Sequence, residues 1–411
     1  MKDKARSDRR NQLFLTLTIF VGFLIFGLSE NVKGPAIPRI QMDFSLSDLQ
    51  LGFLLGLNSL GYLLACFYTA GLARKIGMKI ALLLGLGVMV ISGVVIFLSP
   101  NYFVLTLGYF MLYIGNGMLE ITLGLMCAKI FTKNTGAMMS LSHFFYGLSS
   151  CVAPLLATGL MALQLGPRSG WRVMYLITLC MSLIPMIPAL LGKLKKSRED
   201  KAAATGHGAY LQDRRAWLLI GILSFGVTCE MAISGWLANY AEKAHGISPT
   251  TAAAFLTAFF VCFTLSRLLL GPLIEKIGLA KSLLVFNGFA GSIILLGVLL
   301  GKPGLFLLVA AGLGVAPLYP TVMALLAKLF ASNIDSAMTV TLSLMGVLLV
   351  FSNFMIGGIV EGFTWLFRGL GDGATAAGYS AGFVFIGLCC VAAFLISLAL
   401  YRRMKKDGGL L

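Results

Sequence analysis

The stretch MKIALLLGLGVMVISGVVIFL, residues 78–98, decides the fold class of this chain. About 20 consecutive apolar residues cross the roughly 30 Å hydrocarbon core of a bilayer as an α-helix. The run is continuous and about twice as long as a membrane strand, which alternates apolar and polar residues over about 10 positions. It therefore predicts a membrane-spanning helix.

Similar apolar runs recur along the whole chain. The composition agrees, because 58% hydrophobic residues, 12% charged residues and a mean hydropathy of +0.91 lie outside the range of soluble globular domains. We predict an all-α membrane protein with 12 transmembrane helices. The predicted spans lie near residues 13–33, 47–72, 78–98, 102–130, 137–163, 171–192, 216–241, 249–273, 280–300, 303–330, 335–361 and 379–401.

The longest polar interruption, residues 193–215, separates six predicted spans from six. The two halves match at an offset of 199 to 201 residues: Ala128-Lys-Ile-Phe131 corresponds to Ala327-Lys-Leu-Phe330, and Lys75-Ile-Gly77 to Lys276-Ile-Gly278. Such ordered matches indicate an internal repeat. We predict two pseudo-symmetric six-helix bundles, residues 1–192 and 216–411, joined by a linker at 193–215.

The positions of the Lys and Arg residues, which give the chain a net charge of +16, indicate its topology in the membrane. With both ends on one side of the membrane, all but seven Lys and Arg fall on that side. By the positive-inside rule both termini are cytoplasmic, in a multi-pass protein of the plasma (inner) membrane. The basic residues are dispersed among short loops, so nucleic acid is not an expected partner. The seven assigned to the opposite loops are Lys33, Arg39, Arg168, Arg172, Lys243, Lys302 and Arg368.

No motif for energy coupling or enzyme chemistry competes with a transport function. A Gly-x-x-x-x-Gly-Lys-Ser/Thr phosphate loop and a His-Glu-x-x-His zinc motif are absent from the sequence. The eight cysteines fall in predicted helices without a Cys-x-x-Cys pair, so neither disulfides nor a metal site is expected. We expect a non-enzymatic protein without a cofactor, for which the proton is the coupling ion.

Three glutamates lie within the apolar spans: Glu30, Glu120 and Glu230, of which the first and last are 200 residues apart. A carboxylate is costly in hydrocarbon and persists there mainly for function. Burial favours the neutral form of a carboxyl group, so we predict that these residues gain and lose a proton during transport. The alternative is a permanently protonated glutamate hydrogen-bonded to a neighbouring helix.

The loop after the second predicted span reads Ala70-Gly-Leu-Ala-Arg74-Lys75-Ile-Gly77-Met-Lys79, and its repeat reads Gly271-Pro-Leu-Ile-Glu275-Lys276-Ile-Gly278. With twelve spans in a 6+6 repeat and a basic central loop, the chain resembles the major facilitator superfamily. The resemblance implies that these loops carry gating charges. Arg267 lies one turn before Gly271 and is expected to pair with Glu275 or the linker, or to snorkel to the interface. The predicted gating residues are Arg74, Lys75, Glu275, Lys276 and Arg267.

Within the superfamily the chain resembles the fucose/galactose/glucose:proton symporter family. The likeness rests on Gly115-x-Gly-x-Leu-Glu120, the segment from Gly226 to Tyr240, the segment from Ala254 to Gly271, and Tyr319-Pro-Thr321. It implies alternating access around a central site between the bundles, with sugar as the cargo.

Candidate substrate contacts are polar or aromatic residues on the helices that line this site in the family. Asn116 lies one turn before Glu120 and shares its helix face. The alternatives are packing for His143, and a place in the interfacial aromatic belt for Trp236 and Tyr240. The predicted contacts are Asn116, His143, Tyr146, Trp236, Tyr240 and Tyr319.

These observations predict a monomeric secondary active transporter in the lipid bilayer, which performs proton-coupled symport of a small neutral hydroxylated solute such as a sugar. One alternative is a proton-coupled exporter of amphipathic drugs or lipids, because 19 Met and 29 Phe offer an adaptable apolar lining. Another is a membrane sensor that binds a solute without moving it.

Overall fold

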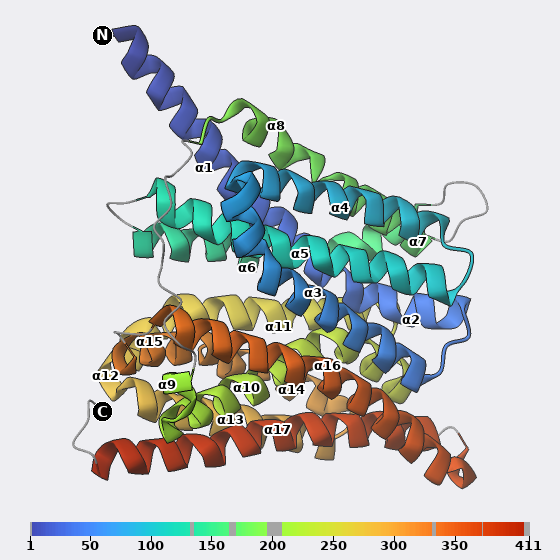
Figure 1. The fold of residues 1–411 in the computed structure, drawn as a ribbon. Helices are drawn as coiled ribbons and strands as arrows, with labels where there is room; N and C mark the ends of the chain where they lie inside the picture. Colours follow the sequence, from blue (N-terminus) through green and yellow to red (C-terminus); the bar gives the residue numbers. More distant parts are fainter. Residues whose placement is uncertain are drawn as a thin grey trace. The chain divides into compact units, whose positions relative to one another are not determined.

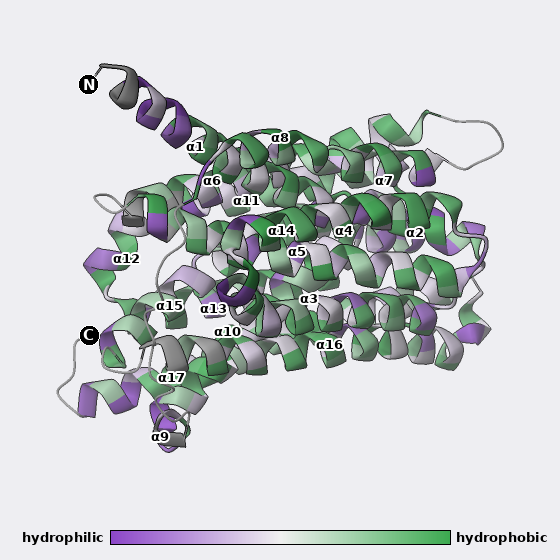
Figure 2. Ribbon diagram, turned by 45° about the horizontal axis from the view of Figure 1, so that its top comes forward, coloured by the Kyte–Doolittle hydropathy of each residue, from purple (hydrophilic) through white to green (hydrophobic). Residues whose placement is uncertain are grey.

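The computed structural model describes residues 2–131, 135–163, 170–194, 208–330, 334–371 and 373–406, and these ranges contain helices and no strand. Twelve helical segments in them are long and apolar enough to cross a membrane, and each overlaps one of the predicted spans. The predicted fold class is therefore confirmed. Figure 1 shows the helices, and Figure 2 shows hydrophobic residues along their lengths with hydrophilic residues gathered near ends such as the first turns of α1.

The chain folds as two compact units, of which the first comprises residues 1–40 and 57–201. Within it, α1 packs against α5, α6 and α8, and α4 packs against α5 and α7. The helices that contribute to this unit are α1 (Lys2–Asn31), α2 (Lys33–Asp43), α3 (Asp48–Ile76), α4 (Met78–Leu98), α5 (Tyr102–Ile130), α6 (Thr135–Met161), α7 (Gly170–Cys180) and α8 (Leu183–Leu191).

The second unit comprises residues 41–56 and 202–411. Here α17 packs against α10, α13 and α16, while α14 packs against α11 and α13. The elements are α9 (Gly208–Leu211), α10 (Arg214–Asn239), the π-helix η1 (Tyr240–Ala244), α11 (Pro249–Leu269), α12 (Gly271–Ile277), α13 (Leu279–Leu299), the 3₁₀ turn η2 (Lys302–Gly304), α14 (Leu305–Val315), α15 (Leu318–Leu329), α16 (Ile334–Leu366), the 3₁₀ turn η4 (Arg368–Leu370) and α17 (Gly373–Lys406).

Residues 41–56 belong to the second unit although they precede most of the first in sequence. Asp48 accepts a hydrogen bond of 2.8 Å from the Tyr379 hydroxyl, and Gln41 accepts one of 3.0 Å from Asn239. The helix α3 therefore contributes its first turns to one unit and the remainder to the other. Our division at residue 192 placed this segment in the N-terminal bundle.

The internal repeat is visible in the backbone. Gly77 and Gly278, which correspond in the sequence repeat, have φ of 97° and 88° and directly precede α4 and α13. A side chain disfavours positive φ, so glycine permits the same sharp turn between consecutive helices in both halves.

Two of the candidate spans are broken at proline. Pro35 has no N–H to donate to the Asn31 carbonyl, and the first span divides into α1 and α2 at this point. Pro320 likewise leaves the Ala316 carbonyl without a helical donor, at the boundary between α14 and α15. Broken helices in membrane proteins free backbone groups for other partners.

The first span is longer than predicted, because its helices run from Arg6 to Asp43 instead of ending near residue 33. Lys33 and Arg39, which we assigned to an outer loop, lie within α2. That assignment was wrong, since the helix is interrupted only at Val32 and resumes at Lys33. Lys33 is also buried, so it is not a loop charge that reports topology.

Candidate functional site

A buried polar cluster in the first unit surrounds Glu30. The Lys33 ammonium donates to the Glu30 carboxylate at 2.6 Å and to the Tyr113 hydroxyl at 2.7 Å. Tyr113 donates to the same carboxylate oxygen at 3.1 Å, and the Asn116 amide donates to the other oxygen at 3.3 Å. The Ser29 hydroxyl donates to the Asn116 carbonyl oxygen at 2.8 Å. We call Ser29, Glu30, Lys33, Tyr113 and Asn116 the Glu30 cluster.

Each member of the Glu30 cluster is at least nine-tenths buried, and Glu30 and Lys33 are 5% and 6% exposed. Removing two opposite charges from water is expensive, and their attraction offsets this cost only when other hydrogen bonds satisfy the remaining atoms. Tyr113 and Asn116 supply those bonds. The cluster is thus a satisfied ion pair whose neutralisation on one side alone is strongly unfavourable.

The local sequence explains how the cluster is assembled. Glu30 and Lys33 are three residues apart across the break before α2, while Tyr113 and Asn116 have the same i,i+3 spacing on α5 and therefore share a face. Gly27 brings α1 close to α6, because a Cβ atom there would meet the Ser149 hydroxyl and the Tyr146 carbonyl.

Glu120 lies on α5 one turn after Asn116, as the sequence predicts. Its Oε2 atom is buried and has no hydrogen-bond partner among the residues that the structure describes. Glu120 is also near enough to Glu30 for the two charges to repel each other. A buried carboxylate oxygen without a donor favours the protonated form or a ligand that donates to it.

The third predicted acid, Glu230, lies buried on α10 in the second unit, where one carboxylate oxygen is 3.9 Å from the Arg267 guanidinium. The Arg267 Nε donates at 3.1 Å to the Ala316 carbonyl that Pro320 leaves free, and its guanidinium lies over the Phe263 ring at 4.3 Å. We expected Arg267 to pair with Glu275 or the linker, or to snorkel to the interface, and the structure instead brings it to Glu230. Glu275 is exposed on α12.

The aromatic candidates of the second unit have partners within it. The Trp236 indole donates to Asn353 at 3.4 Å, and its ring lies 6.4 Å from that of Tyr379. Tyr240 begins the π-helix and stacks on Phe383 with ring centroids 4.4 Å apart. Both side chains are fully buried. Tyr319 is half-buried on α15.

The remaining candidates are two half-buried aromatic residues of α6 and three exposed basic residues at helix ends. His143 and Tyr146 are half-buried on α6, where their rings lie 5.1 Å from Phe23 and 4.9 Å from Phe26 on α1. The gating candidates Arg74, Lys75 and Lys276 are exposed at the ends of α3 and α12.

Lys33 and Tyr113 were missed at the sequence level. Lys33 was read as a loop residue because the first span was taken to end there. Its spacing of three from Glu30 and the following Gly34-Pro35 are the signals that identify it as the partner of that acid in a broken helix. Tyr113 is three residues before Asn116, and that spacing alone places it on the same face.

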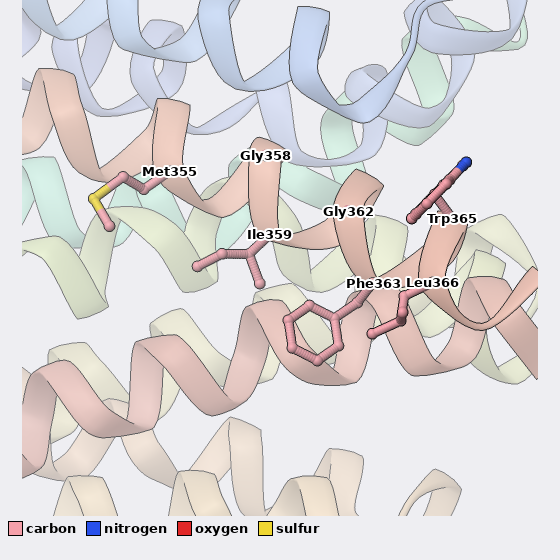
Figure 3. A pocket seen from close by; sticks show the side chains of 7 residues that line it. All are labelled: Met355, Gly358, Ile359, Gly362, Phe363, Trp365 and Leu366. Atoms are coloured by element: carbon pink, nitrogen blue, oxygen red, sulfur yellow. The ribbon is translucent and has the colours of Figure 1, made fainter.

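Two other features lie apart from these residues. An apolar pocket of about 610 Å³ is lined by side chains of α16 between Met355 and Leu366, and it contains no candidate site residue (Figure 3). Gly378-Tyr-Ser-Ala-Gly382 has the letter pattern of a serine-hydrolase nucleophile elbow. It lies inside α17, whereas an elbow requires a sharp turn from a strand to a helix, so it is not one.

Residues 19–255 match the family model described as Major Facilitator Superfamily, which covers more than half of the chain. Among curated proteins, an uncharacterized MFS-type transporter of Yersinia pestis is 23% identical over 64% of this chain and 67% of its own length. The alpha-ketoglutarate permease of Escherichia coli is 25% identical over 57% of this chain and 54% of its own length. The chain thus spans about two thirds of one relative and just over half of the other.

Solved structures show the same fold. A bacterial homologue of the human lysosomal transporter Spinster, in an inward-facing conformation, gives a TM-score of 0.83 at 16% identity over 97% of this chain and 98% of the other. The Escherichia coli fucose:proton symporter gives 0.64 at 18% identity, over 95% and 99%. A D-xylose-proton symporter gives 0.71 at 16% identity, over 92% and 97%.

Proposed function

Because the chain belongs to the major facilitator superfamily, and is therefore a multi-pass membrane transporter and not an enzyme, we propose that it performs proton-coupled symport of a small hydroxylated solute such as a sugar. Transport proceeds by alternating access, and the solute contacts the Glu30 cluster and Glu120. The protein resides in the plasma membrane with both termini cytoplasmic, in accord with the positive-inside bias.

The observation that carries this proposal is the unpartnered Oε2 atom of Glu120 within a membrane span. A carboxylate oxygen buried without a donor is costly when ionised, and taking up a proton relieves that cost. Access of water to the site reverses the preference. A carboxyl group with this behaviour couples the opening of a site to the binding of a proton.

The Glu30 cluster supplies the hydrogen-bonding groups that a hydroxylated solute requires. Tyr113 and Ser29 both donate and accept, the Asn116 amide does the same through separate atoms, and Glu120 offers an acceptor. The fucose:proton and D-xylose-proton symporters, which share the fold, support both the sugar and the proton as ligands.

The test is uptake into proteoliposomes under an imposed inward proton gradient, with radiolabelled neutral and acidic sugars. We expect accumulation that a protonophore abolishes. Glu120→Gln is expected to lose accumulation and to retain exchange of solute across the membrane, because the site still binds but no longer carries the proton. Asp8→Asn, at an exposed position of α1, is the matched control and is expected to behave as wild type.

Accumulation by Glu120→Gln at the wild-type level would remove this residue from coupling. Failure of every sugar, combined with resistance of expressing cells to hydrophobic toxicants, would instead support an exporter. Binding of a sugar without flux, in vesicles shown to be sealed, would support a sensor.

A further inference from the structure

We propose that the transported solute carries a carboxylate group, which replaces Glu30 as the partner of Lys33 when Glu30 takes up a proton. The inference rests on the proposed proton-coupled transport and narrows its substrate class to sugar acids and other small hydroxy acids. No residue outside the first unit is needed for this exchange.

The starting point is the cost of the Lys33 charge. Lys33 lies within the first membrane span and is 6% exposed as a residue, and the two observed acceptors of its ammonium are Glu30 and Tyr113. Of these only Glu30 is anionic. A buried ammonium without a counter-charge is strongly disfavoured, so neutralising Glu30 is costly unless another anion reaches Lys33.

A neutral sugar does not meet this requirement, because a hydroxyl group offers lone pairs and no charge. A carboxylate meets it, since it accepts charge-assisted hydrogen bonds from an ammonium at the same distance that Glu30 now occupies. The helix α2 begins at Lys33, and the partial positive charge at a helix N-terminus adds to the attraction for an anion.

The charges of the cluster balance in this exchange. When Glu120 is protonated, Lys33 and ionised Glu30 sum to zero. Adding one proton to Glu30 and one carboxylate to Lys33 leaves the sum unchanged, so proton and anion bind together at no net charge, whereas either alone leaves an uncompensated ion in a poorly hydrated site.

The surroundings of the pair agree with this scheme. The titratable groups near Glu30 and Lys33 on α5, α6 and α7 are one carboxyl group, that of Glu120, and three phenols, those of Tyr113, Tyr146 and Tyr175. Phenols remain neutral at physiological pH. Glu30 and Glu120 are therefore the carboxyl groups available to the proposed exchange, and the Tyr113 phenol remains available to hydroxyls of a bound acid.

The first experiment compares matched solutes in wild-type proteoliposomes under a proton gradient: galactose with galacturonate, glucose with gluconate, and glycerol with glycerate. We expect at least one acid to accumulate about tenfold above its neutral partner. Accumulation of a neutral sugar with no accumulation of its acid overturns the inference and leaves the proposed function standing. Absence of proton-driven accumulation of every solute overturns both.

The second experiment uses Glu30→Gln, which mimics protonated Glu30 and leaves Lys33 without its internal anion. Binding of the transported acid, measured by thermal shift at pH 8, is expected to tighten about tenfold relative to wild type, because ionised Glu30 no longer competes. A purely structural role for Glu30 predicts weaker binding instead, and that result overturns the inference.

Lys33→Met completes the test, with an expected loss of acid affinity of about 30-fold or more. Its matched control is Lys281→Met, at an exposed lysine of α13, which is expected to bind as wild type. If Lys33→Met does not fold, Glu30→Gln and the wild-type solute comparison decide the matter.

Discussion

Removing the charge of Lys33 is expected to destabilise the protein unless Glu30 is neutralised with it. In Lys33→Met the carboxylate of Glu30 stays buried with Tyr113 and Asn116 but without its ammonium partner at 2.6 Å. Breaking a buried ion pair by removing one member costs about 3–5 kcal/mol. Replacing both members by neutral groups of similar volume is close to neutral, so Glu30→Gln/Lys33→Met is expected to recover most of the loss.

A thiol-reactive fluorescent dye provides the assay, since cysteines 127, 229, 389 and 390 are buried and react only on unfolding. For soluble domains of 150–250 residues 1 kcal/mol shifts Tm by about 2–4 °C, so a loss of about 3–5 kcal/mol corresponds to roughly 10 °C. Equal Tm values for the single and double variants would refute the reasoning, because they would show that Lys33 stabilises through packing and not through the charge of Glu30.

Three further outcomes follow from the structure. Gly278→Ala is expected to lower the free energy of unfolding by about 1–3 kcal/mol, because Gly278 has a positive φ. Gly159→Ala, at a helical position with no atom near the added Cβ, should not lower it, and equal Tm values for the two variants would contradict this. Arg267→Leu removes the guanidinium that lies 3.9 Å from Glu230 and the donor to the Ala316 carbonyl, and a Tm within 1 °C of wild type would contradict a stabilising role for these two contacts. The side-chain and backbone hydrogen bonds from Arg215 lower the pKa of Asp213, the N-cap of α10, below its ordinary value. The stability that this N-cap contributes is therefore present above about pH 4 and is lost as the pH falls through the lowered pKa. Asp213→Asn should lack this acid-dependent decrease in Tm.

Much of the fold is predictable because a helix that crosses the hydrocarbon core needs a continuous run of about 20 apolar residues, whatever its neighbours are. Continuous apolar runs located all twelve segments, and the Lys-Ile-Gly repeat located equivalent turns at Gly77 and Gly278. The length of the first span was not predictable in this way, because Lys33 and Arg39 are charged and hydropathy alone assigns them to water. Only the pairing of Lys33 with Glu30 makes its burial tolerable, and pairing depends on tertiary structure.

The residues of the candidate site likewise include some that the sequence predicts and others that depend on tertiary structure. The acids and Asn116 stand out in the sequence because polar groups are rare in apolar runs. Tyr113 does not, since tyrosine is common at membrane interfaces and its role depends on α1 approaching α5. The partner of Arg267 could not be derived because Glu275 is the nearer acid in sequence, and only the folded α10 and α11 bring the more distant Glu230 to Arg267.

Two of the buried acids have their base in their own unit: Lys33 pairs with Glu30 in the first, and Arg267 pairs with Glu230 in the second. Neither pair therefore needs a charge from the other half of the molecule. A movement of one half past the other severs neither pair, so the charges of these four residues stay compensated while it takes place.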